Sequence, residues 1–376
     1  MSAAFTYSPA GVDSITFACY SIGFWQPTLE RFGFGVVQPQ KAKAEEQGVV
    51  ALAHGDVRLL LIDPTNRARG AEVDDFLVEH GDMQVLSVAV LVDDAVKAQR
   101  ELSMVVDCSS VESGEDAFGE AKRFRLTLPG PSTVTWLLVE RPRQRLPSAD
   151  SWKSRGVDHF AIAVPDLAQW EDVYHALGFE TIYVPKEEIA GEHSGMKTVA
   201  VQRGGWVVAL VAGVDKALPS QVSTYVRTHG QHAIQHAAIR FDNLREALRE
   251  LMDRGVQFRL RRMRPDSTVP VVIDDVMHEG KDHSGPLLQC FTKPLARRPN
   301  PKDPAVSEAG FFFELIQRIS AAKKESATAQ AFHDPTVIGL YRSIEYEEID
   351  QDSGLVFADI GGYRFSEWLA DTLSRT

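Results

Sequence analysis

Two histidines and one glutamate of this sequence could bind a metal ion together. His159 and His236 stand at matching positions of a repeated pattern, and Glu314 lies between Phe313 and Leu315 in a very apolar stretch. Two neutral imidazoles and one carboxylate suit one face of an octahedral Fe(II) ion and leave about three positions open for substrate and O₂. A carboxylate buried in an apolar strand is costly unless a cation offsets its charge. The sequence therefore predicts an iron site at these three residues.

The pattern that contains the histidines occurs four times. Residues 156–167 and 233–244 are its clearest copies, and weaker copies begin near residues 11 and 85. Each copy opens with an alternating strand pattern, and the two clear copies continue into helix-forming stretches at 167–177 and 244–254 that end before a glycine. The equivalent anchor positions, 72 to 77 residues apart, are Ser14, Ser87, His159 and His236.

The first half of the chain serves as an internal control for the metal site. Alignment of 136–141 on 313–318 sets Leu137 against Glu314, and the two histidines correspond to Ser14 and Ser87. Only the second half is therefore predicted to bind the ion.

These modules predict an α+β fold in which four βαβββ units pair into two open-barrel domains. The first domain, 1–145, would bind no metal, and the second, 151–348, would hold the iron and a closing C-terminal helix at 335–348. A linker rich in proline and charge at 141–150 would separate the domains, and 349–376 would form a C-terminal extension.

Composition excludes some functional classes. The formal net charge of −12 argues against a nucleic-acid protein, which needs clustered cations. An N-terminus without an apolar segment, and three cysteines without a Cys-x-x-Cys pair, predict a cytoplasmic protein in a reducing compartment with no membrane partner.

A second histidine cluster offers a rival metal site. His229, His232 and His236 would place two imidazoles at i, i+4 on a helix, as in zinc sites, but the alternation of Ile234, His236 and Ala238 favours a strand. The remaining histidines share no register and are expected at the surface: His54, His80, His175, His193, His278, His283 and His333.

The second half resembles the 4-hydroxyphenylpyruvate dioxygenases and their relatives, the hydroxymandelate synthases, within the vicinal-oxygen-chelate (glyoxalase-like) superfamily. The motifs that carry this resemblance are Gly156-Val-Asp-His-Phe160, Ile234-Gln-His236, Leu287-Leu-Gln-Cys-Phe-Thr-Lys-Pro294, Phe312-Phe-Glu-Leu-Ile-Gln-Arg318 and Leu340-Tyr-Arg-Ser-Ile-Glu345. The resemblance implies an Fe(II) dioxygenase that decarboxylates and hydroxylates a 2-oxo acid through the substrate's own 2-oxo acid group, with no separate 2-oxoglutarate.

The resemblance also assigns substrate-pocket residues, some of which depart from the family pattern. The implied pocket contains Gln221, Gln235, Gln289, Phe291, Phe312, Thr198, Phe332 and Val337. Thr198 replaces a serine, Gly213 an asparagine, Thr336 an asparagine, and Val337 a phenylalanine that normally faces the substrate ring opposite Phe291. Loss of one stacking ring removes about 0.5–1.5 kcal/mol of aromatic preference and widens the pocket.

Three functions follow as hypotheses. The first is the Fe(II) dioxygenase, acting on 4-hydroxyphenylpyruvate or a relative. The second is a 2-oxo-acid oxygenase for an aliphatic or larger aromatic substrate, or a hydroxymandelate-synthase-like enzyme, and the third is a non-catalytic small-molecule binding protein. The expected partners are a small-molecule 2-oxo acid, O₂ and a second copy of the chain in a homo-oligomer.

Overall fold

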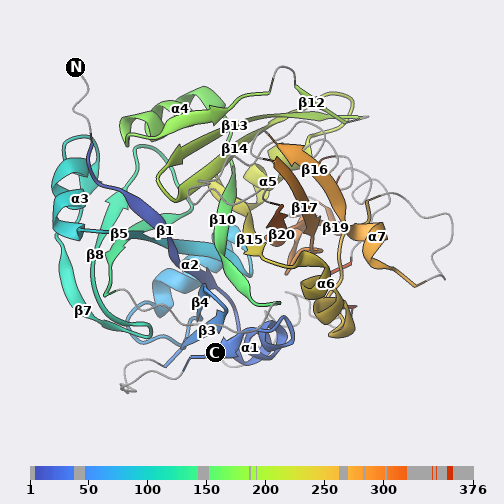
Figure 1. Ribbon diagram of the computed structural model, residues 1–376, viewed down its shortest axis with the longest axis horizontal. Helices are drawn as coiled ribbons and strands as arrows, with labels where there is room; N and C mark the ends of the chain where they lie inside the picture. The colour runs from blue at the N-terminus through green and yellow to red at the C-terminus, as the bar shows by residue number, and fades with distance from the viewer. Residues whose placement is uncertain are drawn as a thin grey trace.

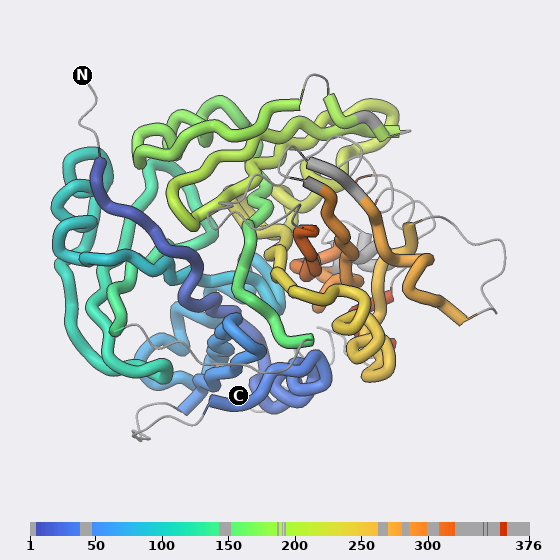
Figure 2. Tube along the Cα trace, in the orientation of Figure 1, coloured from blue at the N-terminus to red at the C-terminus, as the bar shows by residue number. Residues whose placement is uncertain are grey.

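The chain forms two nine-stranded mixed sheets, one from each half (Figure 1). The computed structural model describes residues 5–37, 47–142, 152–185, 188–191, 193–261, 270–282, 285–300, 303–319, 341, 344 and 354–358. Figure 2 shows the first half, in blue and cyan, beside the second half, in green to orange.

The first sheet contains the strands of modules one and two. In order across the sheet they are β2 (Gly35–Val36), β3 (Val49–His54), β4 (Val57–Ile62), β1 (Pro9–Ala18), β5 (Gln84–Val92), β9 (Thr135–Glu140), β8 (Gly119–Thr127) and β6 (Asp107–Cys108), with β7 (Glu112–Asp116) paired to β8.

The second sheet repeats this order. It runs β11 (Glu180–Tyr183), β13 (Gly195–Arg203), β14 (Trp206–Val214), β10 (Ser154–Ala163), β15 (Ala233–Phe241), β20 (Phe312–Arg318), β17 (Gly285–Phe291) and β16 (His278–Asp282), with β12 (Ile189–Ala190) paired to β13. A separate pair, β18 (Arg297–Asn300) and β19 (Asp303–Ala309), lies between β17 and β20 in the sequence.

Seven helices accompany the sheets in the described part of the chain. They are α1 (Ile22–Arg31), α2 (Gly70–His80), α3 (Ala95–Leu102), α4 (Leu167–Ala176), α5 (Gln221–His229), α6 (Leu244–Asp253) and α7 (Ile273–Val276). No helix among these residues is long and apolar enough to cross a membrane.

The two predicted helices of the second half, α4 and α6, end within one residue of expectation. The side chains of Asp166 and Asn243 accept hydrogen bonds from the first-turn amides of these helices. Gly178 and Gly255 follow the helices with φ values of +81° and +85°, which glycine adopts without strain. Two further helices, α2 and α5, join the paired modules and were not predicted from the sequence pattern.

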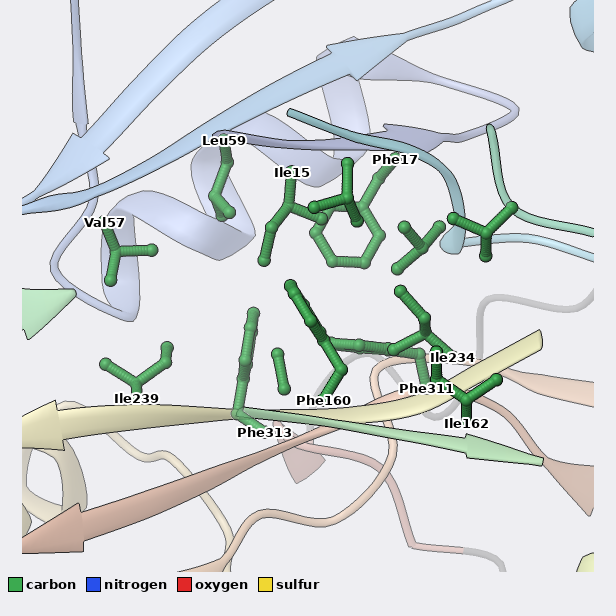
Figure 3. Close-up of a cluster of buried hydrophobic side chains, with 14 of the residues drawn as sticks. Ile15, Phe17, Val57, Leu59, Phe160, Ile162, Ile234, Ile239, Phe311 and Phe313 are labelled. Carbon is green, nitrogen blue, oxygen red and sulfur yellow. The ribbon is translucent and has the colours of Figure 1, made fainter. Parts of the chain in front are cut away.

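The main hydrophobic core lies between the two sheets, as Figure 3 shows. Ile15 and Phe17 of β1 face Phe160 of β10 and Phe313 of β20 there (Figure 3), and the ring centroids of Phe17 and Phe311 lie 4.9 Å apart. Strand side chains alternate between faces. The residues before and after these core residues therefore lie on the opposite face of each sheet.

The predicted α+β fold of four paired modules is confirmed. The domain boundaries 1–145, 151–348 and 349–376 remain predictions, since most of the expected linker and most of the C-terminal region lie outside the described residues. Within the expected closing helix, Tyr341 and Ile344 are helical and buried. In the extension, Phe357 pairs with Val256 as an isolated bridge.

Candidate metal centre and adjoining cavity

Three neighbouring strands of the second sheet carry the predicted metal ligands. His159 of β10 lies opposite Ala238 of β15, and Ala238 lies beside Glu314 of β20. Paired residues point to the same face of a sheet, and His236 precedes Ala238 by two positions. All three side chains therefore lie on one face, opposite the core.

The ligand atoms are close enough to share one ion. The Nε2 atoms of His159 and His236 lie 3.3 Å and 3.5 Å from Oε2 of Glu314, and one donor atom from each residue lies within 4.8 Å of the others. Adjacent donors bound at about 2.1 Å around an octahedral ion lie about 3 Å apart. All three residues are buried, with 3% to 6% of their surface exposed. The arrangement fits a divalent cation.

The electrostatics of the three residues favour a positive charge between them. Burial raises the pKa of Glu314, but the neighbouring His159 outweighs this and lowers it to about 2. Burial lowers the pKa of His159, but Glu314 and Asp158 outweigh this and raise it to about 9. Burial lowers the pKa of His236, which keeps that imidazole neutral. A metal ion would replace the proton of His159.

A carboxylate behind the site orients His159. Val157 pairs with Ile239 and His159 with the adjacent Ala238, so Asp158 is an extra residue that forms a β-bulge in β10. Oδ1 of Asp158 lies 3.0 Å from Nδ1 of His159. Such a contact fixes the ring so that Nε2 points at the ion.

Arg318 holds this carboxylate in turn. Its Nε and Nη2 atoms donate hydrogen bonds of 3.0 Å and 2.8 Å to the two oxygens of Asp158. Neither Asp158 nor Arg318 was predicted as a site residue, although both lie in motifs that carry the family resemblance.

The first sheet contains the same scaffold without the ligands. Ser14 lies opposite Ala89, which lies beside Leu137, and Ser87 lies opposite Thr16. These positions match His159, Glu314 and His236, as the sequence alignment predicted.

The buried acid–arginine pair is also present in the first half. Arg141 donates from Nε to both oxygens of Asp13, at 2.9 Å and 3.0 Å. Asp13 precedes Ser14 as Asp158 precedes His159, so the pair belongs to the repeated fold and the histidine contact is specific to the second half.

A small cavity adjoins the candidate metal centre, since its lining residue Phe312 pairs with His236. The residues that line it are Gln221, Thr224, Tyr225, Gln235, Arg259, Glu308, Ala309, Gly310, Phe312 and Ile344. It thus contains three of the predicted substrate residues, Gln221, Gln235 and Phe312, together with a residue of the C-terminal region.

Two predicted glutamines contact each other in this cavity. Nε2 of Gln235 donates a 3.2 Å hydrogen bond to Oε1 of Gln221 at the start of α5. Ala161 pairs with His236 and Ile162 with Ile234, so Gln235 is the extra residue of a second bulge. The bulge places Gln235 next to His236 at the cavity, where strict alternation would turn it towards the core.

Two predicted phenylalanines border His236. Its ring centroid lies 4.8 Å from that of Phe312 and 6.5 Å from that of Phe291, and the two phenyl rings lie 6.4 Å apart. They provide an apolar wall beside the metal ligands.

Gln289 and Thr198 are also buried on the sheet face that carries the ligands. Gln289 precedes Phe291 by two positions in β17. Thr198 pairs with Val211 of β14, and Val211 follows Ala209, the partner of Ala161, by two positions. The Thr198 hydroxyl donates a 2.9 Å hydrogen bond to the carbonyl of Leu210.

Gly213 has a packing role. A Cβ atom there would clash with Oγ of Ser223 in α5 and lie 2.6 Å from the backbone nitrogen of the same residue. The glycine therefore allows the first turn of α5, which carries Gln221, to lie against β14. Phe332, Thr336 and Val337 lie outside the described residues.

Two buried residues near the site, a cationic arginine and a titratable histidine, were not predicted as site residues from the sequence. Arg259 lines the cavity, 2% exposed. His278, expected at the surface, is 6% exposed and lies with its ring centroid 5.7 Å from that of Phe291. The expectation was also wrong for His54, which is 2% exposed. These histidines share no repeat register, so no sequence pattern indicates their burial.

The rival zinc arrangement does not form. His236 lies in strand β15, His229 ends α5, and His232 lies between them with a φ of 56°. His232 contacts Oγ of Ser132 at 2.8 Å and the hydroxyl of Tyr174 at 3.0 Å, and it stacks on Trp170. It links the two halves of the chain.

Comparisons with known proteins agree with this architecture. Residues 158–268 match the family model of the Glyoxalase/Bleomycin resistance protein/Dioxygenase superfamily. The chain is 26% identical over 336 residues to a 4-hydroxyphenylpyruvate dioxygenase of Xenopus tropicalis, covering 77% of this chain and 80% of that protein. It is 26% identical over 298 residues to the Sus scrofa enzyme of the same name, covering 68% and 71%.

A solved structure shares the fold. A variant of 4-hydroxymandelate synthase from Streptomyces coelicolor superposes with a TM-score of 0.69 at 20% identity, covering 90% of this chain and 99% of that one. The solved structure supports the fold, and the matches to the two dioxygenases confirm the predicted resemblance and the predicted enzyme class, a dioxygenase.

Proposed function

We propose that this chain, a relative of the 4-hydroxyphenylpyruvate dioxygenases, is an Fe(II)-dependent enzyme that decarboxylates and hydroxylates a 2-oxo acid, either 4-hydroxyphenylpyruvate or a related acid. The 2-oxo acid group of the substrate would itself bind the ion, so no second oxo acid is consumed. The observation that carries the proposal is the buried cluster of two Nε2 atoms around one carboxylate of Glu314.

The donor set suits Fe(II). Two imidazoles and one carboxylate on one face offset one of the two charges of the ion and leave its other positions free. When bound, Fe(II) would supply the site for the 2-oxo acid group and the electrons that activate O₂. His159, His236 and Glu314 would hold it, and Asp158 would keep His159 in the orientation that presents Nε2.

The cavity residues would bind and orient the remainder of the substrate. Gln221 and Gln235 offer amide groups that form hydrogen bonds without adding charge beside the ion. Phe291 and Phe312 form an apolar wall next to His236 that excludes water from the reacting carbon.

The decisive experiment is O₂ consumption by the iron-loaded protein with a panel of 2-oxo acids. We expect uptake that depends on both iron and oxo acid, with one CO₂ released per O₂ consumed. A purified protein that holds no iron and shows no oxo-acid-dependent uptake would instead support the non-catalytic binding protein, which is metal-free.

The same panel separates the substrate alternatives. Exclusive turnover of 4-hydroxyphenylpyruvate would reject an aliphatic or larger aromatic substrate. The site of hydroxylation in the product distinguishes a dioxygenase that hydroxylates the ring from a hydroxymandelate-synthase-like enzyme.

A further inference from the structure

We infer that the substrate carries a second, anionic group besides its 2-oxo acid, and that Arg259 and His278 form the subsite that binds it. The inference rests on the proposed function, because it concerns the part of the 2-oxo acid that does not bind the ion. It narrows the substrate class to acids with a further carboxylate or comparable anion.

Arg259 places a permanent positive charge in the cavity. Its backbone nitrogen donates a 2.8 Å hydrogen bond to the carbonyl of Phe291, which fixes the segment against the end of β17. The guanidinium carbon lies 4.9 Å from the ring centroid of Phe312, and only 2% of the residue is exposed. The ring of His236 also lies beside Phe312, with 4.8 Å between their centroids.

His278 and Gln289 add hydrogen-bonding groups on the neighbouring strands. They face each other across β16 and β17, and they are 6% and 3% exposed. Within the described part of the chain, Nε2 of neither residue has a hydrogen-bond partner. Buried polar atoms of this kind usually have partners, so these two indicate a ligand that supplies them.

The side chains of Arg259, His278 and Gln289 lie around the same apolar wall of Phe291 and Phe312. Gln289 precedes Phe291 by two positions, so both lie on one face of β17. The ring centroid of Phe291 lies 5.7 Å from that of His278 and 6.4 Å from that of Phe312. The guanidinium carbon of Arg259 lies 4.9 Å from the centroid of Phe312. A substrate bound to the metal and packed along Phe291 and Phe312 would extend towards these groups.

The charges of the cavity favour an anion at its inner part. Its other charged lining residue, Glu308, is only partly buried, whereas Arg259 is almost fully buried. A guanidinium binds a carboxylate through two parallel hydrogen bonds, and these are stronger where water is excluded. A neutral amide would suffice to bind a phenolic hydroxyl, whereas a guanidinium beside the substrate favours a charged group.

The test uses pairs of 2-oxo acids that differ in one anionic group: 2-oxoadipate against 2-oxohexanoate, and 4-carboxyphenylpyruvate against 4-hydroxyphenylpyruvate. Calorimetry of the Fe(II)-loaded protein without O₂ gives dissociation constants, and O₂ uptake gives kcat/KM. We expect the wild type to bind the anionic member of at least one pair about tenfold more tightly or better, as for a hydrogen bond to a charged group.

Substitutions at Arg259 separate recognition from support of the fold. Arg259→Met should abolish the preference while leaving the neutral member of the pair within about threefold of its wild-type affinity, and Arg259→Lys should retain part of the preference. Arg249→Met is the matched control, since it removes an exposed arginine of α6 that does not line the cavity, and it should change neither affinity. His278→Leu should weaken binding of the anionic acid of a pair and leave binding of the neutral acid unchanged.

Two results would overturn the inference. Equal affinity of the wild type for both members of every pair would exclude an anionic subsite. Equal weakening of both members by Arg259→Met would show that Arg259 holds the common 2-oxo acid group or the fold. Arg259-dependent binding of the anionic acid without O₂ uptake would leave the subsite in place and reject the proposed function alone.

Discussion

The carboxylate of Asp158 lies 3.0 Å from Nδ1 of His159. Arg318 holds the same carboxylate from the other side, and Arg141 holds Asp13 in the same way in the first half. In the first half the next residue is Ser14, which offers no imidazole to orient. The second half thus combines a structural ion pair of the repeated fold with a histidine that we propose as a metal ligand.

Asp158→Asn should weaken metal binding. The amide cannot hold the imidazole of His159 as a carboxylate does, and loss of such an outer partner costs about 10- to 100-fold in metal affinity. Competition with a chelator measures the affinity. Asp13→Asn is the control, because it breaks the equivalent ion pair far from the ligands, and it should lower thermal stability without changing metal affinity. Equal affinities for wild type and Asp158→Asn would show that Asp158 serves only the fold.

His236→Ala should remove stoichiometric iron and reduce O₂ uptake by at least about 100-fold, since two ligands cannot hold the ion in the proposed geometry. Ser87→Ala changes the equivalent position of the first half and should leave iron content and uptake unchanged. Elemental analysis and an oxygen electrode measure both quantities. Full iron content in His236→Ala would place the metal elsewhere.

Acid should destabilise the protein from pH 6.5 downwards. Burial lowers the pKa of His232 to about 3. In the unfolded chain a histidine titrates near pH 6.5, so between these values the unfolded state binds the extra proton. The free energy of unfolding therefore falls as the pH decreases, by up to about 1.4 kcal/mol per pH unit for each such residue. His54 and His229 change the free energy of unfolding in the same direction, because burial lowers their pKa values to about 3 and about 4.

Urea unfolding at pH 7, 6 and 5 measures this slope. His232→Gln should reduce it by about one proton, whereas Ser132→Ala, which removes a hydrogen-bond partner of His232 and no titratable group, should lower stability equally at each pH. An unchanged slope in His232→Gln would contradict the assignment.

Arg298→Met should lower stability by about 1–3 kcal/mol. The guanidinium donates hydrogen bonds of 2.8 Å and 2.5 Å to the carbonyls of Val78 and Glu79 at the end of α2, and another to the carbonyl of Thr228 near the end of α5. It thereby joins helices of the two halves. Chemical denaturation measures the loss. Arg298→Lys, which keeps the charge with fewer directed donors, should be less affected, and a Met variant as stable as wild type would refute the role.

Gly213→Asn should destabilise the protein. The change introduces the asparagine that the 4-hydroxyphenylpyruvate dioxygenases usually have at this position. The new Cβ atom would lie 2.6 Å from the backbone nitrogen of Ser223, so the first turn of α5 must move, at a cost of about 1–3 kcal/mol. Gly35→Asn provides the control, because no atom lies within 4 Å of a Cβ at that position. Thermal unfolding compares the two variants, and equal melting temperatures would mean that α5 adjusts without strain.

The repeated modules and the register of the proposed ligands can be predicted from the order of the amino acids alone. A period of two places His159, His236 and Glu314 on one face of their strands, and the serine and leucine equivalents identify the half without ligands. The helix boundaries followed from Asp166, Asn243 and the glycines, because capping is local chemistry.

The surroundings of the proposed ligands depend instead on how the chain folds in three dimensions. Two β-bulges turn Asp158 and Gln235 towards the site against the alternation of their strands, and a bulge depends on the pairing partner. The burial of Arg259 and His278 depends on contacts between distant segments that no local period encodes. Local sequence specifies the face on which a side chain lies, whereas its neighbours and its degree of burial depend on the long-range assembly of the strands.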